Sequence, residues 1–245
     1  MYSSTKKSRQ KKVLPLIGLL LFLSGFVVFG QDDFYYTRIQ EKKISIEQYW
    51  EGFNLTQEMV DNANGSPYPT KDFLPGRLYK DTETVSTTIP LRYNAFSDEI
   101  EVKPSEKGLA PASIKKDPDI FAKIGNEIYI YAENNRSRNG GGYFKMLKDL
   151  PVYDLLKKVD VGFRPAEYAK TSYAKDKPAQ FISTTTYFLT DDLGNFYELP
   201  KNKSKLLKVM SAKELEVKAF MKKNKIDPSK EDDLIQLVTY FNSLL

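Results

Sequence analysis

The sequence predicts a mainly β fold of the α+β class: an antiparallel β-meander, folded as a sandwich or an open barrel, with a C-terminal helical tail. Three observations favour this class. Short segments rich in β-forming residues recur at hairpin spacing between Gly65 and Leu199. No helix-length pattern separates them, which argues against parallel βαβ units. After Pro200 the apolar residues change from alternation to helical spacing.

Residues 1–30 predict a secretory signal peptide that is cleaved after Gly30. Five basic residues precede an apolar run from Val13 to Phe29, and polar residues follow. The run spans about 17 residues, near the lower limit for a transmembrane helix, so an uncleaved N-terminal membrane anchor is the alternative. Both interpretations export the remaining chain to the periplasm or the cell exterior, either free or anchored in the inner membrane and facing the periplasm.

Residues 31–200 are predicted to form the β-rich domain, with a short helix over Ser45–Met59 near its start. Gly125-Asn126 between two apolar segments indicates a two-residue hairpin turn. Asn94–Asp98 and Asp191–Asn195 are typical turn sequences, because Asn and Asp side chains bond their own backbone. We expect about eight to ten strands, over residues 77–80, 84–93, 99–103, 121–124, 127–131, 143–147, 153–163, 181–189 and 196–199.

Residues 201–245 are predicted to form a helical tail that packs on this domain. Ser211 and Glu214 have the spacing of a capping box, which marks a helix start. Residues 201–225 contain nine lysines and two acids. Such a segment either meets an anionic lipid, polysaccharide or protein, or forms the solvated face of helices. The last helix is expected to bury an apolar stripe made of Leu234, Leu237, Val238, Phe241 and Leu245.

The composition of the 245-residue chain excludes several kinds of chemistry. It has no Cys and no His, so disulfides, thiol nucleophiles, thiolate zinc sites and Ser-His-Asp triads are ruled out. Five of its 37 basic residues precede residue 31, which leaves 32 bases against 32 acids in the remainder. A nucleic-acid partner is therefore not expected. Neither is a cofactor or a metal, because Asp191, Asp192 and Asn195 fit a plain turn better than a Ca²⁺ site.

The candidate binding residues surround the predicted Asn94–Asp98 turn: Arg92, Tyr93, Asn94, Asp98, Glu99 and Glu101. Glu99 and Glu101 are two residues apart on one predicted strand and therefore share a face. A glycosidase needs paired carboxylates as acid and base, but adjacent acids on one strand commonly form a solvated face. We expect Arg92 to pair with one of these acids across the hairpin. No catalytic residue is assigned.

Tyrosines are frequent, and a tyrosine-rich β-surface can bind sugar rings or a protein partner. Cross-strand packing of the rings is the simpler interpretation. The residues concerned are Tyr68, Tyr93, Tyr129, Tyr131, Tyr143 and Tyr197.

Two parts of the chain resemble a group of uncharacterised exported proteins of Bacteroidota. The first contains Gly65-Ser66-Pro67-Tyr68, Pro90-Leu91-Arg92-Tyr93-Asn94 and Asp98-Glu99-Ile100-Glu101. The second runs from Lys222-Lys223-Asn224-Lys225 through Glu231-Asp232-Asp233-Leu234 to Tyr240-Phe241-Asn242-Ser243-Leu244. The resemblance implies an exported β-rich domain with a helical tail. It implies no activity, so no functional residue is transferred.

These observations predict an exported, non-catalytic cell-envelope protein that binds a partner protein or a glycan, or has a structural role. The alternative is a carboxylate-based, glycosidase-like hydrolase of envelope or extracellular polysaccharide, using Glu99 or Glu101 with a distant acid. Contact with a membrane is expected only through the N-terminal segment, if it stays uncleaved. The sequence does not indicate an oligomeric state.

Overall fold

The structure, a computed structural model, describes residues 61–80, 83–103, 111–133, 141–169 and 175–245. The predicted signal peptide or anchor and the predicted helix over residues 45–59 lie outside the described residues. The described part is a single antiparallel sheet of eleven strands followed by three short α-helices. The predicted class, a mainly β fold with a helical tail, is therefore confirmed. All strands belong to one open sheet rather than to two facing sheets.

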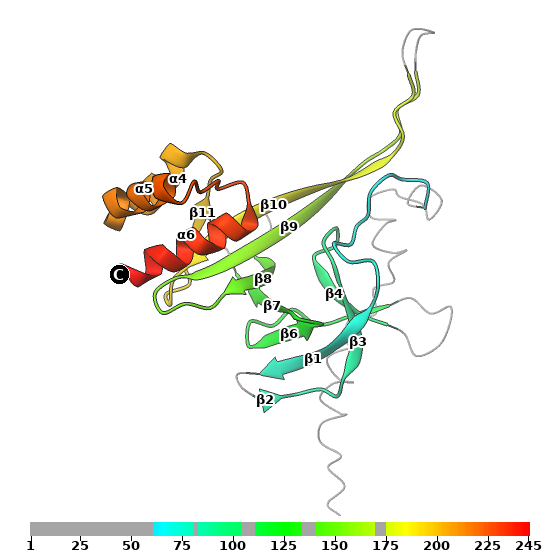
Figure 1. Cartoon of the computed structure of the whole chain (residues 1–245). Coiled ribbons are helices and arrows are strands. Elements are labelled where there is room, and N and C mark those ends of the chain that lie inside the picture. Colours follow the sequence, from blue (N-terminus) through cyan, green and yellow to red (C-terminus); the bar gives the residue numbers. More distant parts are fainter. Residues whose placement is uncertain (1–60, 81–82, 104–110, 134–140, 170–174) are drawn as a thin grey trace, which may run out of the picture.

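The sheet is mostly a meander, because most strands pair with their neighbours in sequence. The strand order is β11-β10-β9-β8-β7-β6-β1-β3-β4-β5, with β2 paired to β1. Figure 1 shows the strands from β11 through β8 to β1 following one another away from the helices. The strands are β1 (Leu74–Lys80), β2 (Glu83–Thr84), β3 (Ile89–Asn94), β4 (Glu99–Val102), β5 (Ala112–Ser113), β6 (Ile120–Ile124), β7 (Glu127–Ala132), β8 (Gly142–Lys148), β9 (Asp154–Arg164), β10 (Gln180–Thr190) and β11 (Phe196–Leu199).

Local turn chemistry sets the hairpins as the sequence predicts. Gly125 has φ 58°, which suits glycine, and the Gly125-Asn126 pair joins β6 to β7 with Ile124 opposite Glu127. Asp191 accepts hydrogen bonds from the backbone N–H groups of Leu193 and Asn195, so the turn interpretation of this segment is confirmed. The expected strand over residues 84–93 is instead divided into β2 and β3.

The sheet curls until the turn after β3 reaches β9. The backbone N–H of Val161 donates to the Ala95 carbonyl at 3.3 Å, across the concave side. The main core fills this concavity with apolar residues of β1, β3, β4, β6, β7 and β8, and Val159 and Val161 pack against it. Beyond this contact β9 and β10, each eleven residues long, continue together as a projecting two-stranded arm (Figure 1).

The helical tail covers one face of the sheet near β9–β11 (Figure 1). It consists of α4 (Lys203–Val209), a 3₁₀ turn over Ser211–Lys213, α5 (Glu214–Lys223) and α6 (Glu231–Ser243). Four residues of the predicted stripe are buried in α6, whereas Leu245 is 48% exposed. This apolar face packs with Leu155, Tyr187 and Leu189 of the sheet into a second core.

The predicted capping box at Ser211 and Glu214 is wrong. A 3₁₀ turn occupies Ser211–Lys213, α5 begins at Glu214, and no side-chain hydrogen bond caps α5. The cap lies earlier instead, where Asn202 Oδ1 accepts from the Lys205 backbone N–H at 3.0 Å and begins α4.

Polar contacts also hold the tail on the sheet. Glu231 of α6 pairs with Lys157 of β9 at 2.6 Å and accepts a hydrogen bond from the Tyr187 hydroxyl. The buried Asn242 side chain bonds both the N–H and the C=O of Tyr153. None of the helices in the described part of the chain is long and apolar enough to cross a bilayer.

Candidate functional site

The candidate site lies where the turn between β3 and β4 inserts between β8 and β9. The pairing of β8 with β9 ends at Lys145 opposite Lys157, so the two strands separate beyond this point. Residues 95–98 fill the gap. Asn94 Oδ1 shapes the turn by accepting from the N–H groups of Phe96 and Ser97 at 3.0 and 3.1 Å. Asp98 completes it in the left-handed region with φ 53°, which Asp tolerates better than most residues.

The Asp98 carboxylate binds the β8 backbone where β9 no longer pairs with it. It accepts the Tyr143 backbone N–H at 3.1 Å and the Tyr93 hydroxyl at 2.8 Å. Lys158 forms an ion pair with the same carboxylate, and Lys116 lies 3.5 Å from its other oxygen. The Lys158 ammonium also donates to the Tyr143 carbonyl at 3.0 Å. Asp98 is therefore saturated with donors, and its main effect is to hold the turn.

Gly142 leaves the space that this ion pair occupies. A Cβ built on Gly142 would overlap Asp98 Oδ2 and would lie 2.5 Å from the Lys158 ammonium nitrogen. Any larger residue must displace one of the two charged groups. Glycine is thus required here for close approach of side chains, not for an unusual backbone angle.

Arg92, Asn94 and Glu101 lie together on the outer face of the β3–β4 hairpin. Arg92 stands opposite Glu101 and donates to Glu101 Oε2 through Nε at 3.1 Å and Nη2 at 2.6 Å. The predicted cross-hairpin pair is therefore confirmed. The Asn94 amide donates to Glu101 Oε1 at 2.8 Å. Burial raises the pKa of Glu101, while the Arg92 guanidinium and the Asn94 amide oppose that shift.

The segment before β1 covers this face. The Arg92 guanidinium carbon lies 3.6 Å from the Tyr68 ring centroid and 4.2 Å from that of Phe73. Its Nη1 donates to the Lys71 carbonyl at 2.9 Å. Burial, then the charge of Glu101, raises the pKa of Tyr68 to about 12. The arrangement fixes the covering segment to the hairpin.

The interpretation of the β4 acids as a solvated face is wrong. Glu101 is 2% exposed and Glu99 is 7% exposed. Ser113 of β5 donates its hydroxyl to Glu99 Oε2 at 2.5 Å. The two acids do share a face of the sheet, but β5 and the segment before β1 exclude water from it, because their own polar groups satisfy the carboxylates.

A cleft of about 770 Å³ opens beside the inserted turn. On one side it is lined by the turn residues Ala95–Glu99. On the other side is the start of the β9–β10 arm, where Asp160 stands opposite Thr184 and Gly162 opposite Ile182. A Cβ built on Gly162 would meet nothing within 4 Å. The remaining lining residues are Lys116, Tyr131, Gly141 and Val161.

The polar groups that line the cleft differ in their burial and in their hydrogen-bond and charge partners. Asp160 is exposed; partial desolvation nevertheless raises its pKa, and the Asp98 charge adds to that rise against the opposing Lys158. The Ser97 hydroxyl oxygen is buried and has no hydrogen-bond partner among the described residues. Lys116 lies 6.0 Å from the Tyr131 ring centroid. The cleft therefore offers a carboxyl, hydroxyls, an ammonium and an aromatic ring.

Five of the six predicted site residues fall into two groups. Asp98 and Glu99 line the cleft, while Arg92, Asn94 and Glu101 form the covered cluster on the outer face. Tyr93 is buried in the core, with its ring tilted against that of Tyr129 at a centroid distance of 5.1 Å and edge-on to Tyr143. Cross-strand packing is confirmed for Tyr131 and Tyr143, which stand opposite each other on β7 and β8 with ring centroids 5.7 Å apart, whereas Tyr93 packs on rings of strands that are not its neighbours. Whether the six residues bind a ligand stays a prediction.

Sequence reasoning missed Asp160, Thr184 and Lys116. The alternation of β9 shows only that Lys158 and Asp160 share a face opposite Val159 and Val161. That signal marks a polar side of a strand and does not indicate a cleft, because the cleft needs the distant turn.

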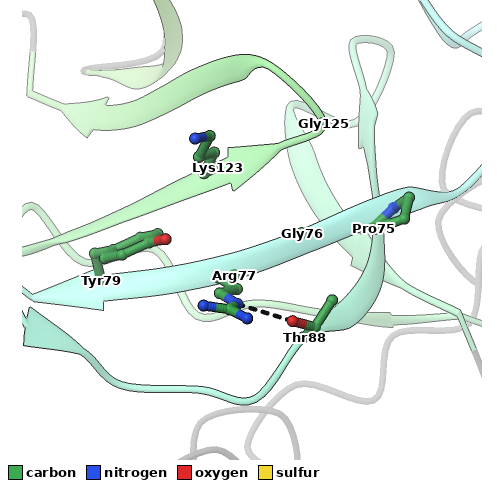
Figure 2. A pocket seen from close by; sticks show the side chains of 7 residues that line it. All are labelled: Pro75, Gly76, Arg77, Tyr79, Thr88, Lys123 and Gly125. Carbon is green, nitrogen blue, oxygen red and sulfur yellow. Dashed lines mark hydrogen bonds between the residues drawn. The ribbon is translucent and has the colours of Figure 1, made fainter.

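A second hollow, of about 260 Å³, follows β1 (Figure 2). Arg77 Nε donates to Thr88 Oγ1 at 2.8 Å on one side of it, and Lys123 stands on the neighbouring strand β6. Its lining among the described residues holds two cations and no acid, and it is the smaller of the two. The cleft beside the turn is therefore the stronger candidate.

In the described residues, no group of three acids is close enough to hold a metal ion. No protein-family model matches the chain, and neither a curated protein nor a solved structure matches it.

Proposed function

We propose that this chain is an exported, non-catalytic protein of the cell envelope whose cleft beside the β3–β4 turn binds a glycan. The export part rests on the pattern of residues 1–30. The observation that carries the binding part is the composition of the cleft wall. Hydroxyl, carboxyl and ammonium groups surround one half-buried tyrosine, Tyr131, on a rigid sheet.

A sugar suits this wall better than an apolar ligand. Its hydroxyl groups would exchange hydrogen bonds with Asp160 and Thr184, which lie side by side on β9 and β10. An aromatic ring gives the apolar face of a sugar a flat surface to contact. Pockets of 300–1,000 Å³ are typical of small-ligand sites, and about 770 Å³ accommodates a short oligosaccharide.

The absence of catalysis in this proposal follows from Asp98. Its oxygens are occupied by Tyr93, Tyr143 and two lysines, so it cannot also exchange a proton with a substrate. Glu101 is covered and paired with Arg92. Asp98 and Glu101 thus position the protein's own groups.

The test is a calorimetric titration of the full chain with muropeptides and with oligosaccharides from the envelope of the organism that makes the protein. Replacing Gly162 by Phe would place a ring in the cleft without a clash at its Cβ and should abolish binding. Thr184→Val should weaken it about tenfold through one lost hydrogen bond. Thr186→Val, two residues along the same strand and absent from the cleft lining, is the matched control. Binding that survives Gly162→Phe would refute the proposal.

A second candidate is a carboxylate hydrolase that uses Asp160. Partial desolvation and the Asp98 charge raise its pKa, as a general acid requires, and Glu99, whose carboxylate is held by Ser113, borders the same cleft. Turnover of a bound glycan that Asp160→Asn abolishes, with binding retained, would favour this candidate. Turnover unaffected by Asp160→Asn, or none at all, would eliminate it.

A further inference from the structure

The outward face of α5 carries an exposed leucine among lysines. Val217 and Met221 point into the core, so the opposite face of the helix, with Leu215, Ala219 and Lys222 at helical spacing, is turned outward. Leu215 is 79% exposed, one of the most exposed large apolar residues in the described part of the chain.

Lysines dominate the surroundings of Leu215. Lys218 and Lys223 flank the outward face, and Lys205 and Lys208 lie exposed on α4, which contacts α5. Residues 201–225 hold nine lysines against two acids, Glu214 and Glu216, which occupy the first turn of α5. The lysines that form ion pairs within the described residues lie elsewhere: Lys80, Lys116, Lys145, Lys157, Lys158 and Lys177.

We propose that the outward face of α5 docks on an anionic phospholipid bilayer, with Leu215 inserted between head groups and the lysines on the lipid phosphates. Charge complementarity alone would fit any polyanion. The exposed leucine favours a bilayer over a polysaccharide. A bilayer offers an apolar side chain the boundary of its acyl chains to insert into, whereas a polysaccharide offers no apolar interior. The long aliphatic part of each lysine side chain lets its ammonium group reach the lipid phosphates while Leu215 inserts between the head groups.

The fold favours this contact further. The helix is already formed and held by α4 and α6, so docking costs no folding entropy. The contact adds to the one expected of residues 1–30. It is independent of the glycan proposal, since the cleft and α5 share no residue.

The experiment uses the absence of Cys from the full chain. Leu215→Cys creates a single thiol for an environment-sensitive NBD fluorophore. On vesicles of phosphatidylglycerol and phosphatidylcholine in equal parts, its emission should rise and shift to the blue. On phosphatidylcholine alone, or in high salt, it should not. Leu193→Cys, at an 87% exposed position in the β10–β11 turn, is the matched label control and should not respond.

Charge variants separate docking by α5 from any membrane contact of the N-terminal segment. Replacing Lys218, Lys222 and Lys223 by Glu should weaken the affinity of the labelled protein for anionic vesicles at least about a hundredfold. Each lysine near the surface contributes about a factor of five, and the three factors multiply. Replacing Lys103, Lys148 and Lys175, which are exposed elsewhere, should leave it unchanged. Three outcomes would overturn the proposal: a silent label at position 215, an equal response on neutral vesicles, or an equal response to soluble polyglutamate or hyaluronate.

Discussion

Replacing Gly142 by alanine should destabilise the fold strongly, although the change adds one methyl group. The new Cβ would overlap Asp98 Oδ2 and would lie 2.5 Å from the Lys158 ammonium nitrogen. Lys158 can swing away, but the carboxylate is held by Tyr93 and by the Tyr143 N–H. Either the ion pair separates or the inserted turn retreats from β8.

The magnitude follows from the bonds at risk. Charge-assisted hydrogen bonds contribute about 1.5–3 kcal/mol each, and breaking a fully buried ion pair costs about 3–5 kcal/mol. Because the Asp98 and Lys158 side chains are 19% and 11% exposed, water offsets part of that loss. We expect a loss of about 2–4 kcal/mol in the free energy of unfolding, which moves the urea midpoint by about 1–2 M.

Gly162→Ala is the matched control. Its Cβ would meet nothing within 4 Å, and alanine restricts the unfolded chain, so a gain of about 0.4–1 kcal/mol is expected. Urea unfolding of both variants, followed by circular dichroism, compares them directly. If Gly142→Ala lies within about 1 kcal/mol of wild type, the carboxylate does not fix the turn, and this account of the site is wrong.

Three further predictions concern the covered cluster and the tail. Arg92→Lys should cost about 1–3 kcal/mol, because lysine lacks the planar fork that bonds Glu101, while Arg77→Lys at an exposed site should cost under about 0.5 kcal/mol; equal losses in urea unfolding would contradict this. Asn242→Ala should cost about 1–3 kcal/mol by leaving the partly buried Tyr153 backbone unpaired, and a thermal midpoint no lower than that of Thr239→Ala would refute it. Burial works to raise the pKa of Glu231, but hydrogen bonds from Lys157 and Tyr187 hold it below its usual range. Its contribution is thus present above the unfolded pKa of about 4.3 and is lost as pH falls through the folded value. Glu231→Gln should be about 0.5–1 kcal/mol less stable at neutral pH, a figure reduced for partial exposure, and should lose less stability on acidification; identical acid limbs in pH-dependent unfolding would disprove this.

Much of the fold was predictable because its signals are local. Alternating residues and turn sequences located the strands from β3 to β11 except β5, which is not among the predicted strands, and apolar spacing located α6. The local signal failed at Ser211, where a capping box was predicted and a 3₁₀ turn formed. Asn202 is the actual N-cap, but the sequence did not indicate it because α4 begins without a clear apolar stripe.

The candidate site was only partly predictable. The Arg92–Glu101 pair follows from hairpin register, which a short turn determines. The burial of Glu99 and Glu101 does not, because it depends on where β5 and the segment before β1 cross the hairpin. Asp160 joined the site only because the sheet curls.

By itself the sequence determined most of the strands, the tight hairpin turns and the classes of chemistry that a chain without Cys and His cannot perform. Only the tertiary structure decided that Asp98 meets Lys158, sixty residues away, over the bare backbone of Gly142. The physical reason is the distance along the chain over which each kind of interaction acts. Turn and strand preferences act over a few residues, whereas the position of the inserted turn depends on the twist accumulated across all the strands between β3 and β9.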